Sequence, residues 1–366
     1  MKIALVHDFL NQYGGAERVV EALHEIYPDA PLFTSIYDPE KMPAVFRKMD
    51  IRTSFMQNIP FVSQTARYYF MLYPLAFESF DLNEYDVILS SSSAYAKGIK
   101  KRPDQLHICY CHNPMRFVWR YHDYIQREAI PDWVKKAIPF LLDPLKKWDR
   151  QNSQGVDYFI ANSATVAQRI SGIYGRESDI INPPVGTDKF KPAMIDRDEF
   201  LVVSRLAGYK RLDIVIEAFN RLELPLKVIG DGPARKAMQK KAKGNIEFLG
   251  RLPDEQLAIH LAECRALIFP GEEDFGITPL EAMASGRPVI AFNAGGAKET
   301  VIEGETGLFF NEQNADSLVN AVNKLRFMLF DKNRIREQAL KFDKSVFKIK
   351  IERFVSEKYE KRSHAR

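Results

Sequence analysis

The residues best suited to chemistry lie in Phe269–Gly286, which reads FPGEEDFGITPLEAMASG. An apolar strand ends there, and a loop with two glycines leads into a helix. Free backbone N–H groups at the helix start, Gly276–Thr278, would bind an anion. We expect Glu281 in the first helical turn, where its carboxylate would accept two hydrogen bonds from a ribose diol, and Glu273 in the loop, within reach of a sugar hydroxyl. The plainer alternative is that both acids only stabilise the helix N-terminus.

Two cations follow another apolar strand, in Ser204–Lys210 (SRLAGYK). Arg205 and Lys210 leave the same strand end, and a diphosphate leaving group needs positive charge as its bond to a sugar breaks. Arg211 is a third candidate, which we expect to be solvated. Gly230 opens a tight turn after the next strand and would flank a nucleotide. A solvated basic loop and an ordinary turn are the alternatives.

A third loop, His7–Arg18 (HDFLNQYGGAER), follows the first apolar strand. Gly14 and Gly15 would let the backbone approach a ligand. Their spacing does not match the dinucleotide fingerprint with three glycines. The alternative is a mobile loop whose glycines need positive φ. Gly14 and Asp8 are candidates for binding an acceptor.

The segment Cys109–Pro114 (CYCHNP) places His112 at the end of a further strand. An exposed polar residue there would face the ligand-binding edge of a sheet, and a purely structural histidine is the alternative. Two thiols beside a histidine also suggest zinc, but the sequence offers no second pair of ligands, so we expect no metal. Ser90–Ser93 follow a strand as well, and Ser92 would offer its hydroxyl to an acceptor or cap a helix.

The elements that must position these residues alternate between short apolar strands and helical patterns. This alternation predicts βαβ units, parallel sheets and an α/β fold. We expect strands at Lys2–His7, Leu32–Ile36, Val87–Ser90, Leu106–Tyr110, Tyr158–Ala161, Phe200–Ser204, Leu226–Ile229, Ile246–Leu249, Ala266–Pro270 and Pro288–Phe292. We expect helices at Ala16–Tyr27, Leu212–Arg221, Ala234–Lys243, Glu255–Glu263 and Thr278–Ser285, and two or three charged helices after about Asn314.

The proline-rich stretch Ile181–Pro192 reads as a linker between two domains. The length of 366 residues also favours two domains. We predict an acceptor-binding domain at 1–184, a nucleotide-sugar-binding domain at 185–345 and a helical tail at 346–366 that returns to the first domain. Two doubly wound sheets bind ligands at the carboxyl ends of their strands, and we expect those ends to face each other across a cleft.

Composition excludes several other classes of protein. The net charge of +4 is too small for a typical nucleic-acid binder, and 46% hydrophobic residues exclude a disordered chain. Three cysteines do not make a disulfide framework and favour a reducing compartment. His7 and Asp8 interrupt the first apolar run, so it reads as a strand and not as a signal peptide. With no long apolar stretch, we expect a cytoplasmic protein.

These motifs identify a family resemblance that covers most of the chain. SRLAGYKRLDIVIEAF, VIGDGP, EFLGRLPDEQL and FPGEEDFGITPLEAMASGRPVIAFNAGGAKETV resemble the family 4 glycosyltransferases, which are retaining enzymes of the GT-B fold. The resemblance implies a nucleotide-sugar donor, no cofactor and no metal. It assigns the diphosphate to Arg205 and Lys210, the ribose to Glu281, and the donor sugar to Glu273 and His112. The remaining donor contacts that it implies are Gly15, Gly230, Phe275, Gly276, Ile277 and Thr278.

The N-terminal portion carries a narrower resemblance. HDFL followed by GGAE, and YCHNPMRFVW, look like bacterial O-antigen and exopolysaccharide mannosyltransferases that use GDP-mannose. The family implies front-face attack, with the departing phosphate taking the acceptor proton and domain closure excluding water. UDP-sugar donors remain the alternative within this class. A nucleotide-sugar epimerase and a non-catalytic nucleotide-sugar-binding subunit are the alternatives from other classes.

One basic stretch has a charge pattern that these motifs do not explain. Lys97–Arg150 holds twelve Lys or Arg residues against six Asp or Glu residues, interleaved with aromatic residues. It suggests peripheral contact with an anionic membrane at the inner face of the cell, where a lipid-linked acceptor would lie. A solvated face over core aromatic residues is the alternative. No partner nucleic acid is expected.

Overall fold

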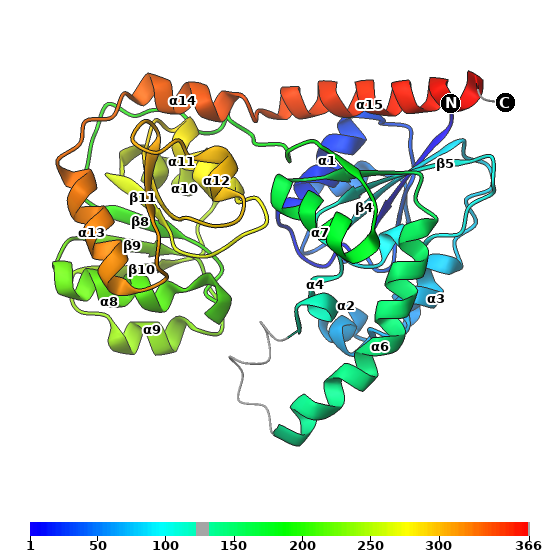
Figure 1. Cartoon of the computed structure of the whole chain (residues 1–366), viewed down its shortest axis with the longest axis horizontal. Coiled ribbons are helices and arrows are strands. Elements are labelled where there is room, and N and C mark those ends of the chain that lie inside the picture. Colours follow the sequence, from blue (N-terminus) through cyan, green and yellow to red (C-terminus); the bar gives the residue numbers. More distant parts are fainter. Residues whose placement is uncertain (122–131, 365–366) are drawn as a thin grey trace. The chain divides into compact units, whose positions relative to one another are not determined.

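The computed structural model describes residues 1–121 and 132–364 of the chain (Figure 1). The chain divides into two compact units. Unit 1 comprises Met1–Pro184 and Ser345–Arg366, and unit 2 comprises Val185–Lys344. Each unit is built around one parallel β-sheet, so the described chain is an α/β protein.

Unit 1 contains a seven-stranded parallel sheet in the order β3-β2-β1-β4-β5-β6-β7. Its strands are β1 (Ile3–His7), β2 (Leu32–Thr34), β3 (Ile51–Thr53), β4 (Val87–Ser92), β5 (Leu106–Cys111), β6 (Tyr158–Ala161) and β7 (Ser178–Ile180). Its α-helices are α1 (Gly15–Ile26), α2 (Val62–Thr65), α3 (Tyr73–Glu78), α4 (Arg116–Trp119), α6 (Asp132–Gln154), α7 (Ala164–Tyr174) and α15 (Lys344–His364). Short 3-10 helices are η1 (Ala44–Lys48), η2 (Phe55–Asn58), η3 (Ala66–Tyr69) and η4 (Ala96–Gly98).

The strand β1 shows why this sequence forms a sheet covered on both faces. All five of its residues are buried. Ile3 and Leu5 pack into one apolar cluster, whereas Ala4 and Val6 pack into another on the opposite face. Side chains alternate between the two faces of a strand, so a strand covered on both sides reads as a continuous apolar run.

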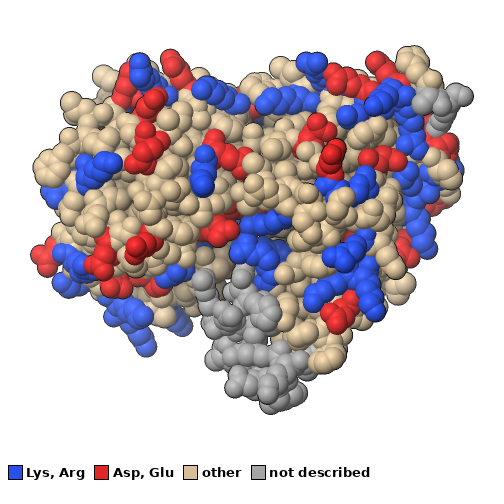
Figure 2. All heavy atoms as spheres, in the orientation of Figure 1, with Lys and Arg blue, Asp and Glu red and all other residues tan. Residues whose placement is uncertain are grey.

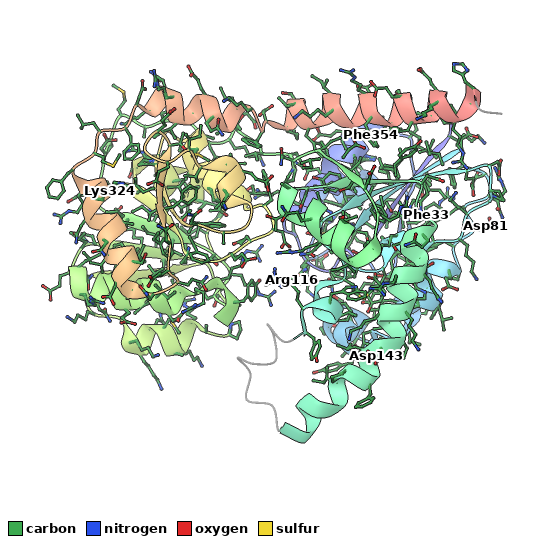
Figure 3. The ribbon with its side chains drawn as sticks, in the orientation of Figure 1. Phe33, Asp81, Arg116, Asp143, Lys324 and Phe354 are labelled. Atoms are coloured by element: carbon green, nitrogen blue, oxygen red, sulfur yellow. The ribbon has the colours of Figure 1, made fainter. Side chains whose placement is uncertain are left out.

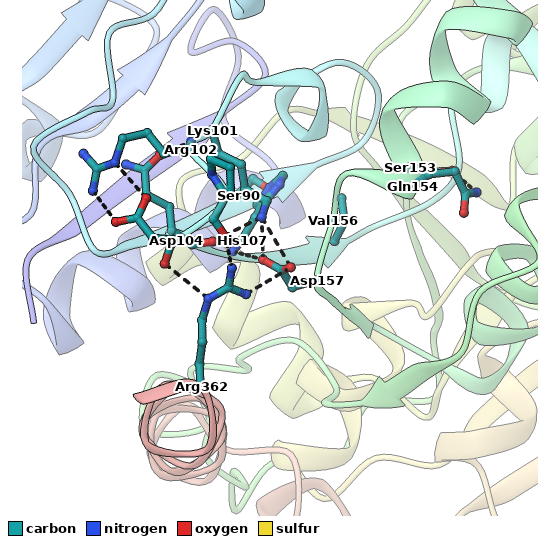
Figure 4. Close-up of polar contacts among 12 residues, drawn as sticks. Ser90, Lys101, Arg102, Asp104, His107, Ser153, Gln154, Val156, Asp157 and Arg362 are labelled. Carbon is teal, nitrogen blue, oxygen red and sulfur yellow. Dashed lines mark hydrogen bonds and ion pairs between the residues drawn. The ribbon is translucent and has the colours of Figure 1, made fainter. Parts of the chain in front are cut away.

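The helix α15 completes one of these two clusters from far along the chain. Phe347, Ile351, Phe354 and Val355 are buried in the same cluster as Ile3 and Leu5. Figure 3 shows Phe354 beneath α15, on the side of unit 1. Figure 4 shows Arg362 at the other end of α15, where its guanidinium bonds to the carbonyl oxygens of Pro103 and Asp104 and pairs with Asp157 at 3.2 Å.

Unit 2 contains a six-stranded parallel sheet in the order β10-β9-β8-β11-β12-β13. Its strands are β8 (Phe200–Val203), β9 (Leu226–Ile229), β10 (Ile246–Gly250), β11 (Ala266–Phe269), β12 (Val289–Phe292) and β13 (Gly307–Phe310). Its helices are η5 (Gly208–Lys210), α8 (Leu212–Leu222), α9 (Arg235–Lys241), α10 (Asp254–Glu263), α11 (Ile277–Ala284), α12 (Ala297–Thr300), α13 (Ala315–Arg326) and α14 (Lys332–Leu340). Two apolar clusters again cover the two faces of the sheet.

The strand orders locate where a ligand would bind in each unit. In unit 1 the order reverses between β1 and β4, and in unit 2 it reverses between β8 and β11. Doubly wound sheets bind ligands at the carboxyl ends of strands beside such a switch point. The loops after β1, β4, β8 and β11 carry most of the site residues that the sequence predicts.

The element predictions differ from the structure mainly at edges and irregular segments. Helix α11 begins at Ile277, one residue before the predicted start at Thr278, and α9 is shorter at both ends than predicted. The edge strands β3, β7 and β13 were not predicted. The long helix α6 was not predicted either, because Pro139 and Pro144 lie inside it and proline usually interrupts a helix. The three helices expected near the end are α13, α14 and α15.

Candidate functional site

In unit 2, the loops after β8 and β11 bring Lys210 and Glu273 into contact. The Lys210 Nζ lies 2.5 Å from the Glu273 Oε1, and the two side chains are 16% and 26% exposed. The Lys210 ammonium also lies 5.2 Å from the centre of the Tyr209 ring. A Cβ on Gly271 would lie 3.4 Å from the Lys210 Cα, in ordinary van der Waals contact, so the two loops run side by side. One half-exposed site therefore presents a cation and a carboxylate at the switch point of the sheet.

Glycines hold these loops against one another through their backbones. Gly230 has φ +127°, and a Cβ there would lie 1.9 Å from the carbonyl oxygen of Ser204. Gly232 meets the carbonyl of Leu206 in the same way, at 2.4 Å. Any larger residue would push the Arg205 loop out of place. Gly230, predicted to flank a nucleotide, therefore shapes the cationic loop whatever else it contacts.

Two further glycines were missed by the sequence analysis. A Cβ on Gly295 would lie 2.2 Å from the carbonyl oxygen of Glu273, and one on Gly296 would lie 2.2 Å from the Phe275 Cα. The N–H of Gly296 donates to the Glu273 carbonyl at 2.9 Å. The loop after β12 thus supports the loop that carries Glu273. The adjacent glycines in FNAGG, directly after a predicted strand, were the available signal.

The helix α11 begins at a glycine N-cap. Gly276 is the N-cap residue with φ +88°, and a Cβ there would lie 2.8 Å from the Phe269 ring. Ile277 and Thr278 follow as half-buried first residues of the helix. Without a side-chain cap on Gly276, the first amides of α11 are not bonded by that residue.

Two predicted donor residues lie deeper than expected. Glu281 is the fifth residue of α11, so it lies in the second helical turn and not in the first, and it is only 3% exposed. Phe275 is 3% exposed, and its ring packs 5.8 Å from that of Phe342. The side chain of Phe275 therefore belongs to the core, and only its backbone is placed to contact a ligand.

The cations Arg205 and Arg211 have different surroundings. Arg205 is exposed, and within residues 1–121 and 132–364 its side chain has no ion-pair partner. Arg211, expected to be solvated, pairs with Asp213 at 3.2 Å and donates to the Gln313 side chain at 2.8 Å. Arg211 is therefore committed to the fold, whereas Arg205 is available for a ligand.

In unit 1, His112 follows β5 at the carboxyl edge of the sheet. Its Nε2 lies 2.8 Å from the hydroxyl of Ser91, the neighbouring residue of β4. The ring lies 5.2 Å from that of Tyr110, and Asn162 donates to the His112 carbonyl at 3.1 Å. Strand pairing therefore fixes the backbone of His112, and the serine orients its ring.

Asp8 has a structural task that the sequence did not suggest. It is 1% exposed, and its carboxylate accepts from the backbone N–H groups of four consecutive residues, Ser93–Ala96, at 2.5–3.0 Å. A carboxylate saturated by four amides has little capacity for another ligand. We therefore do not carry Asp8 forward as an acceptor-binding residue. Ser92, the last residue of β4, is also buried at 1% exposure.

The glycine pair after β1 is ordered without positive φ. Gly14 has φ −154° and is the N-cap of α1, and Gly15 is the first, exposed residue of that helix. The Glu17 carboxylate accepts from the Gly14 N–H at 2.8 Å. The loop is therefore held by a capping interaction, and the alternative of glycines needing positive φ is wrong.

The cysteines do not form a metal site with His112. Within the described residues, no group of three or more His, Cys, Asp or Glu side chains is placed to hold a metal ion. Cys109 and Cys111 are both buried. Burial, and then the neighbouring Cys109, raise the pKa of the Cys111 thiol, which disfavours the thiolate that zinc needs.

Comparison with known proteins identifies the class of unit 2. Residues 187–342 match the family model described as glycosyl transferases group 1. This match covers nearly all of unit 2 and agrees with the family 4 resemblance of the motifs there.

Relatives with curated names carry the same class. The chain is 33% identical over 134 residues to the O-antigen chain mannosyltransferase C of Escherichia coli, covering 34% of this chain and 36% of that protein. It is 31% identical over 173 residues to a GDP-mannose-dependent alpha-(1-6)-phosphatidylinositol monomannoside mannosyltransferase of Mycolicibacterium smegmatis, covering 39% and 45%. The chain thus spans less than half the length of these relatives.

Solved structures show the fold over nearly the whole chain. Anabaena HepE in complex with UDP matches with a TM-score of 0.72 at 19% identity, covering 98% of this chain and 100% of that one. Sucrose-phosphate synthase from Thermosynechococcus elongatus matches with a TM-score of 0.74 at 15% identity, covering 98% and 99%. The prediction of a GT-B fold with two Rossmann-like domains is confirmed.

Proposed function

We propose that this protein is a retaining glycosyltransferase that moves a hexose from a nucleoside-diphosphate sugar to an acceptor. The observation that carries the proposal is the contact between Lys210 and Glu273 at the switch point of unit 2, beside the start of α11. The diphosphate of such a donor needs a cation, and the hydroxyls of its sugar need a hydrogen-bond acceptor. Lys210 would supply the cation, and Glu273 would supply the acceptor.

Each donor group has a partner among the described residues of unit 2. Lys210 and exposed Arg205 would hold the diphosphate and stabilise it as the bond to the sugar breaks. The first amides of α11 would bind a phosphate oxygen. Glu273 would orient a sugar hydroxyl, and the ribose diol would reach inward to Glu281. In this proposal the departing phosphate takes the proton of the acceptor, so no protein nucleophile is required.

We favour GDP-mannose as the donor. The name of the mycobacterial relative specifies GDP-mannose, and the name of the Escherichia coli relative specifies mannose transfer. A UDP-sugar is the second candidate, since solved structures of similar fold contain UDP and UDP-glucose. Both candidates present the same diphosphate to Lys210.

The donor is identified by thermal unfolding of the full chain with GDP, UDP, ADP and their common sugar conjugates. A ligand that binds only the folded state raises the unfolding temperature by mass action. We expect GDP and GDP-mannose to stabilise the wild type, and Glu281→Ala to lose this effect. Glu247→Ala, an exposed residue of the same unit, is the control and should keep it. Stabilisation by UDP-sugars alone would overturn the assignment of GDP-mannose as the donor. If no nucleotide stabilised the protein, the proposal that it is a glycosyltransferase would be overturned.

For the acceptor we propose a lipid-linked sugar at an anionic membrane, bound by unit 1 with help from Gly14 and Ser92. Of the basic stretch Lys97–Arg150, residues 122–131 lie outside the described part. Of the described part, Lys100, Lys147 and Arg150 are exposed, and Phe140 is 79% exposed. Figure 2 shows Lys and Arg side chains gathered on the face of unit 1 that it draws. No helix of the described residues is long and apolar enough to cross a membrane.

A second segment of unit 1 supports this proposal. Phe61, Tyr68, Met71 and Leu75 are 46–80% exposed, and no acidic residue lies between Asp50 and Glu78. Aromatic and aliphatic side chains in a segment that has arginines but no acidic residue suit the interfacial region of an anionic bilayer.

Vesicle flotation tests the membrane contact. We expect the full chain to float with vesicles containing anionic phosphatidylglycerol and not with neutral ones, and the double substitution of Phe61 and Leu75 by serine to weaken flotation. Phe327→Ser changes an equally exposed residue of unit 2 and should have no effect. Failure of the wild type to float with anionic vesicles contradicts the membrane contact.

A further inference from the structure

A chain of polar contacts runs through unit 1 from the glycine loop to His112. The Glu17 carboxylate accepts from the Gly14 N–H at 2.8 Å with one oxygen, and its other oxygen lies 3.5 Å from the Nε2 of His7. The Nδ1 of His7 lies 3.0 Å from the Ser91 carbonyl oxygen and 3.2 Å from the Ser91 hydroxyl. That hydroxyl lies 2.8 Å from the Nε2 of His112. Four residues thus connect α1, β1, β4 and β5 at one edge of the sheet.

The burial of this chain is more than helix capping requires. Glutamate is almost never fully buried in a protein unless it is paired. Here Glu17 is 3% exposed and His7 is 1% exposed. A buried carboxylate is costly unless a cation accompanies it. The capping bond accounts for one oxygen of Glu17, and the other lies 3.5 Å from the Nε2 of His7.

The contacts determine where the protons lie. A carbonyl oxygen can only accept, so the Nδ1 of His7 carries the proton that it shares with Ser91. Burial lowers the pKa of His7, but the hydrogen bond and charge of Glu17, the charge of Asp8 and the Ser91 carbonyl together outweigh it, and the pKa is raised. Among the described residues, Glu17 and Asp8 are the charged groups that act on His7. The charged form of His7 is therefore more stable here than in a free histidine, and its two N–H groups would face Glu17 and Ser91.

This arrangement leaves one role for the Ser91 hydroxyl. Since Nδ1 of His7 already carries a proton, the hydroxyl cannot donate to it and accepts there instead. Its own proton is then free for the other neighbour within hydrogen-bond distance, the Nε2 of His112. An imidazole that accepts at Nε2 carries its proton at Nδ1 when neutral.

We propose that Glu17 and His7 are positioning residues that act through Ser91 to hold His112 as the neutral tautomer protonated at Nδ1. The inference rests on the proposed function, in which His112 hydrogen-bonds to the transferred sugar, and it names what His112 offers there: an N–H donor for a sugar oxygen. The same carboxylate accepts from the Gly14 N–H, so the glycine loop and His112 are linked by one chain of polar contacts.

The tautomer is measured directly by nitrogen NMR of the histidine side chains in the full chain labelled on histidine, with the His112 signals assigned by their loss in His112→Gln. We expect a protonated Nδ1 and an unprotonated Nε2 at His112 in the wild type. Ser91→Ala and Glu17→Gln should move His112 toward the Nε2–H form or an average of both, and Ser91→Thr should restore the wild-type signals. An Nε2–H form in the wild type, or signals unchanged by Ser91→Ala, would overturn the proposal.

The chain offers a closely matched control. Ser90, one residue earlier on β4, bonds through its hydroxyl to the Nε2 of His107 at 2.8 Å. Ser90→Ala removes an equivalent buried hydroxyl and should leave the His112 signals unchanged. An equal response of His112 to Ser90→Ala would show a general loosening of the sheet and would contradict the proposal.

Transfer kinetics separate this inference from the proposed function. We expect Ser91→Ala to lower kcat by about 10–100-fold, in the range of misplaced catalytic contacts, with little change in the KM for the donor. Ser91→Thr should retain most of the activity. If the NMR result is as expected but His112→Gln keeps full turnover, the tautomer stands and the role of His112 in the proposed function fails. If kcat falls equally in Ser91→Thr, in which the hydroxyl is retained, the positioning role fails.

Discussion

Because Lys210 and Glu273 are in contact, we expect substitutions of these two residues to have opposite effects on nucleotide binding. Removing the cation with Lys210→Met should weaken the binding of a nucleoside diphosphate, whereas removing the carboxylate with Glu273→Gln should strengthen it. The reason is that Glu273 lies 2.5 Å from Lys210 in the structure and competes with the diphosphate for the same ammonium.

The expected size follows from Coulomb's law. Two unit charges about 4 Å apart at an effective dielectric constant of about 20 interact by about 4 kcal/mol. Lys210 is 16% exposed, and screening by solvent and salt reduces this to about 2 kcal/mol, or about 30-fold in Kd. Glu273→Gln should improve the Kd about 3–10-fold. The double variant should bind more tightly than the sum of the two single effects predicts, because the carboxylate that faces the phosphates unpaired in Lys210→Met is then absent, and the difference gives a coupling energy of about 1–2 kcal/mol.

Isothermal titration calorimetry with GDP or UDP, whichever stabilises the wild type, measures all four proteins. Lys236→Met removes an exposed cation from α9 and should leave the Kd unchanged. Weaker binding in Glu273→Gln, or additive effects in the double variant, would refute the competition between the carboxylate and the diphosphate. Glu273→Gln should nevertheless transfer sugar more slowly, since the sugar loses its orienting acceptor.

Three further predictions concern stability. Asp8→Asn replaces one of two oxygens that accept four amides and should destabilise unit 1 by about 3 kcal/mol in urea unfolding, whereas exposed Asp29→Asn should be neutral. Gly230→Ala should lower the unfolding temperature and nucleotide affinity together, since its Cβ would lie 1.9 Å from a carbonyl oxygen; Gly244→Ala has open space and should do neither. Burial lowers the pKa of His107 to about 3, so it stays neutral when folded but binds a proton when unfolded below its ordinary value of 6.5. Stability should therefore fall by about 2 kcal/mol from pH 7 to pH 5, and His107→Gln should remove that part of the fall. Identical pH dependence in both proteins would contradict the burial of a neutral His107.

The sequence was sufficient to predict most of the strands that are buried on both faces. The strand β1 and its counterpart β8 are short apolar runs, and such runs are read directly from the residue order. The edge strands β3 and β7 were missed because they are largely exposed and only three residues long. The edge strand β13 was missed although most of its four residues are buried. The helix α6, of 23 residues, was not predicted because two prolines lie inside it.

The candidate site was predictable as a set of residues but not as a set of contacts. The glycine loop and helix start near Glu273 are local features, which sequence reveals. The contact of Lys210 with Glu273 depends on two loops packing together, and the four amides on Asp8 depend on a turn some 85 residues away. The depth of Glu281 depended on a helix start that lay one residue earlier than predicted.

The return of α15 to unit 1 has a consequence for synthesis. The cluster around Ile3 and Leu5 lacks Phe347 and Phe354 until the segment 345–366 has left the ribosome. Translation of 185–344 at roughly 5–20 residues per second takes about 10–30 s, and the contiguous unit 2 can fold during that time. During this time the apolar face of unit 1 that α15 later covers stays exposed. A chaperone would recognise this exposed face on the nascent protein. Shortening the chain from its C-terminal side should therefore damage the N-terminal unit first.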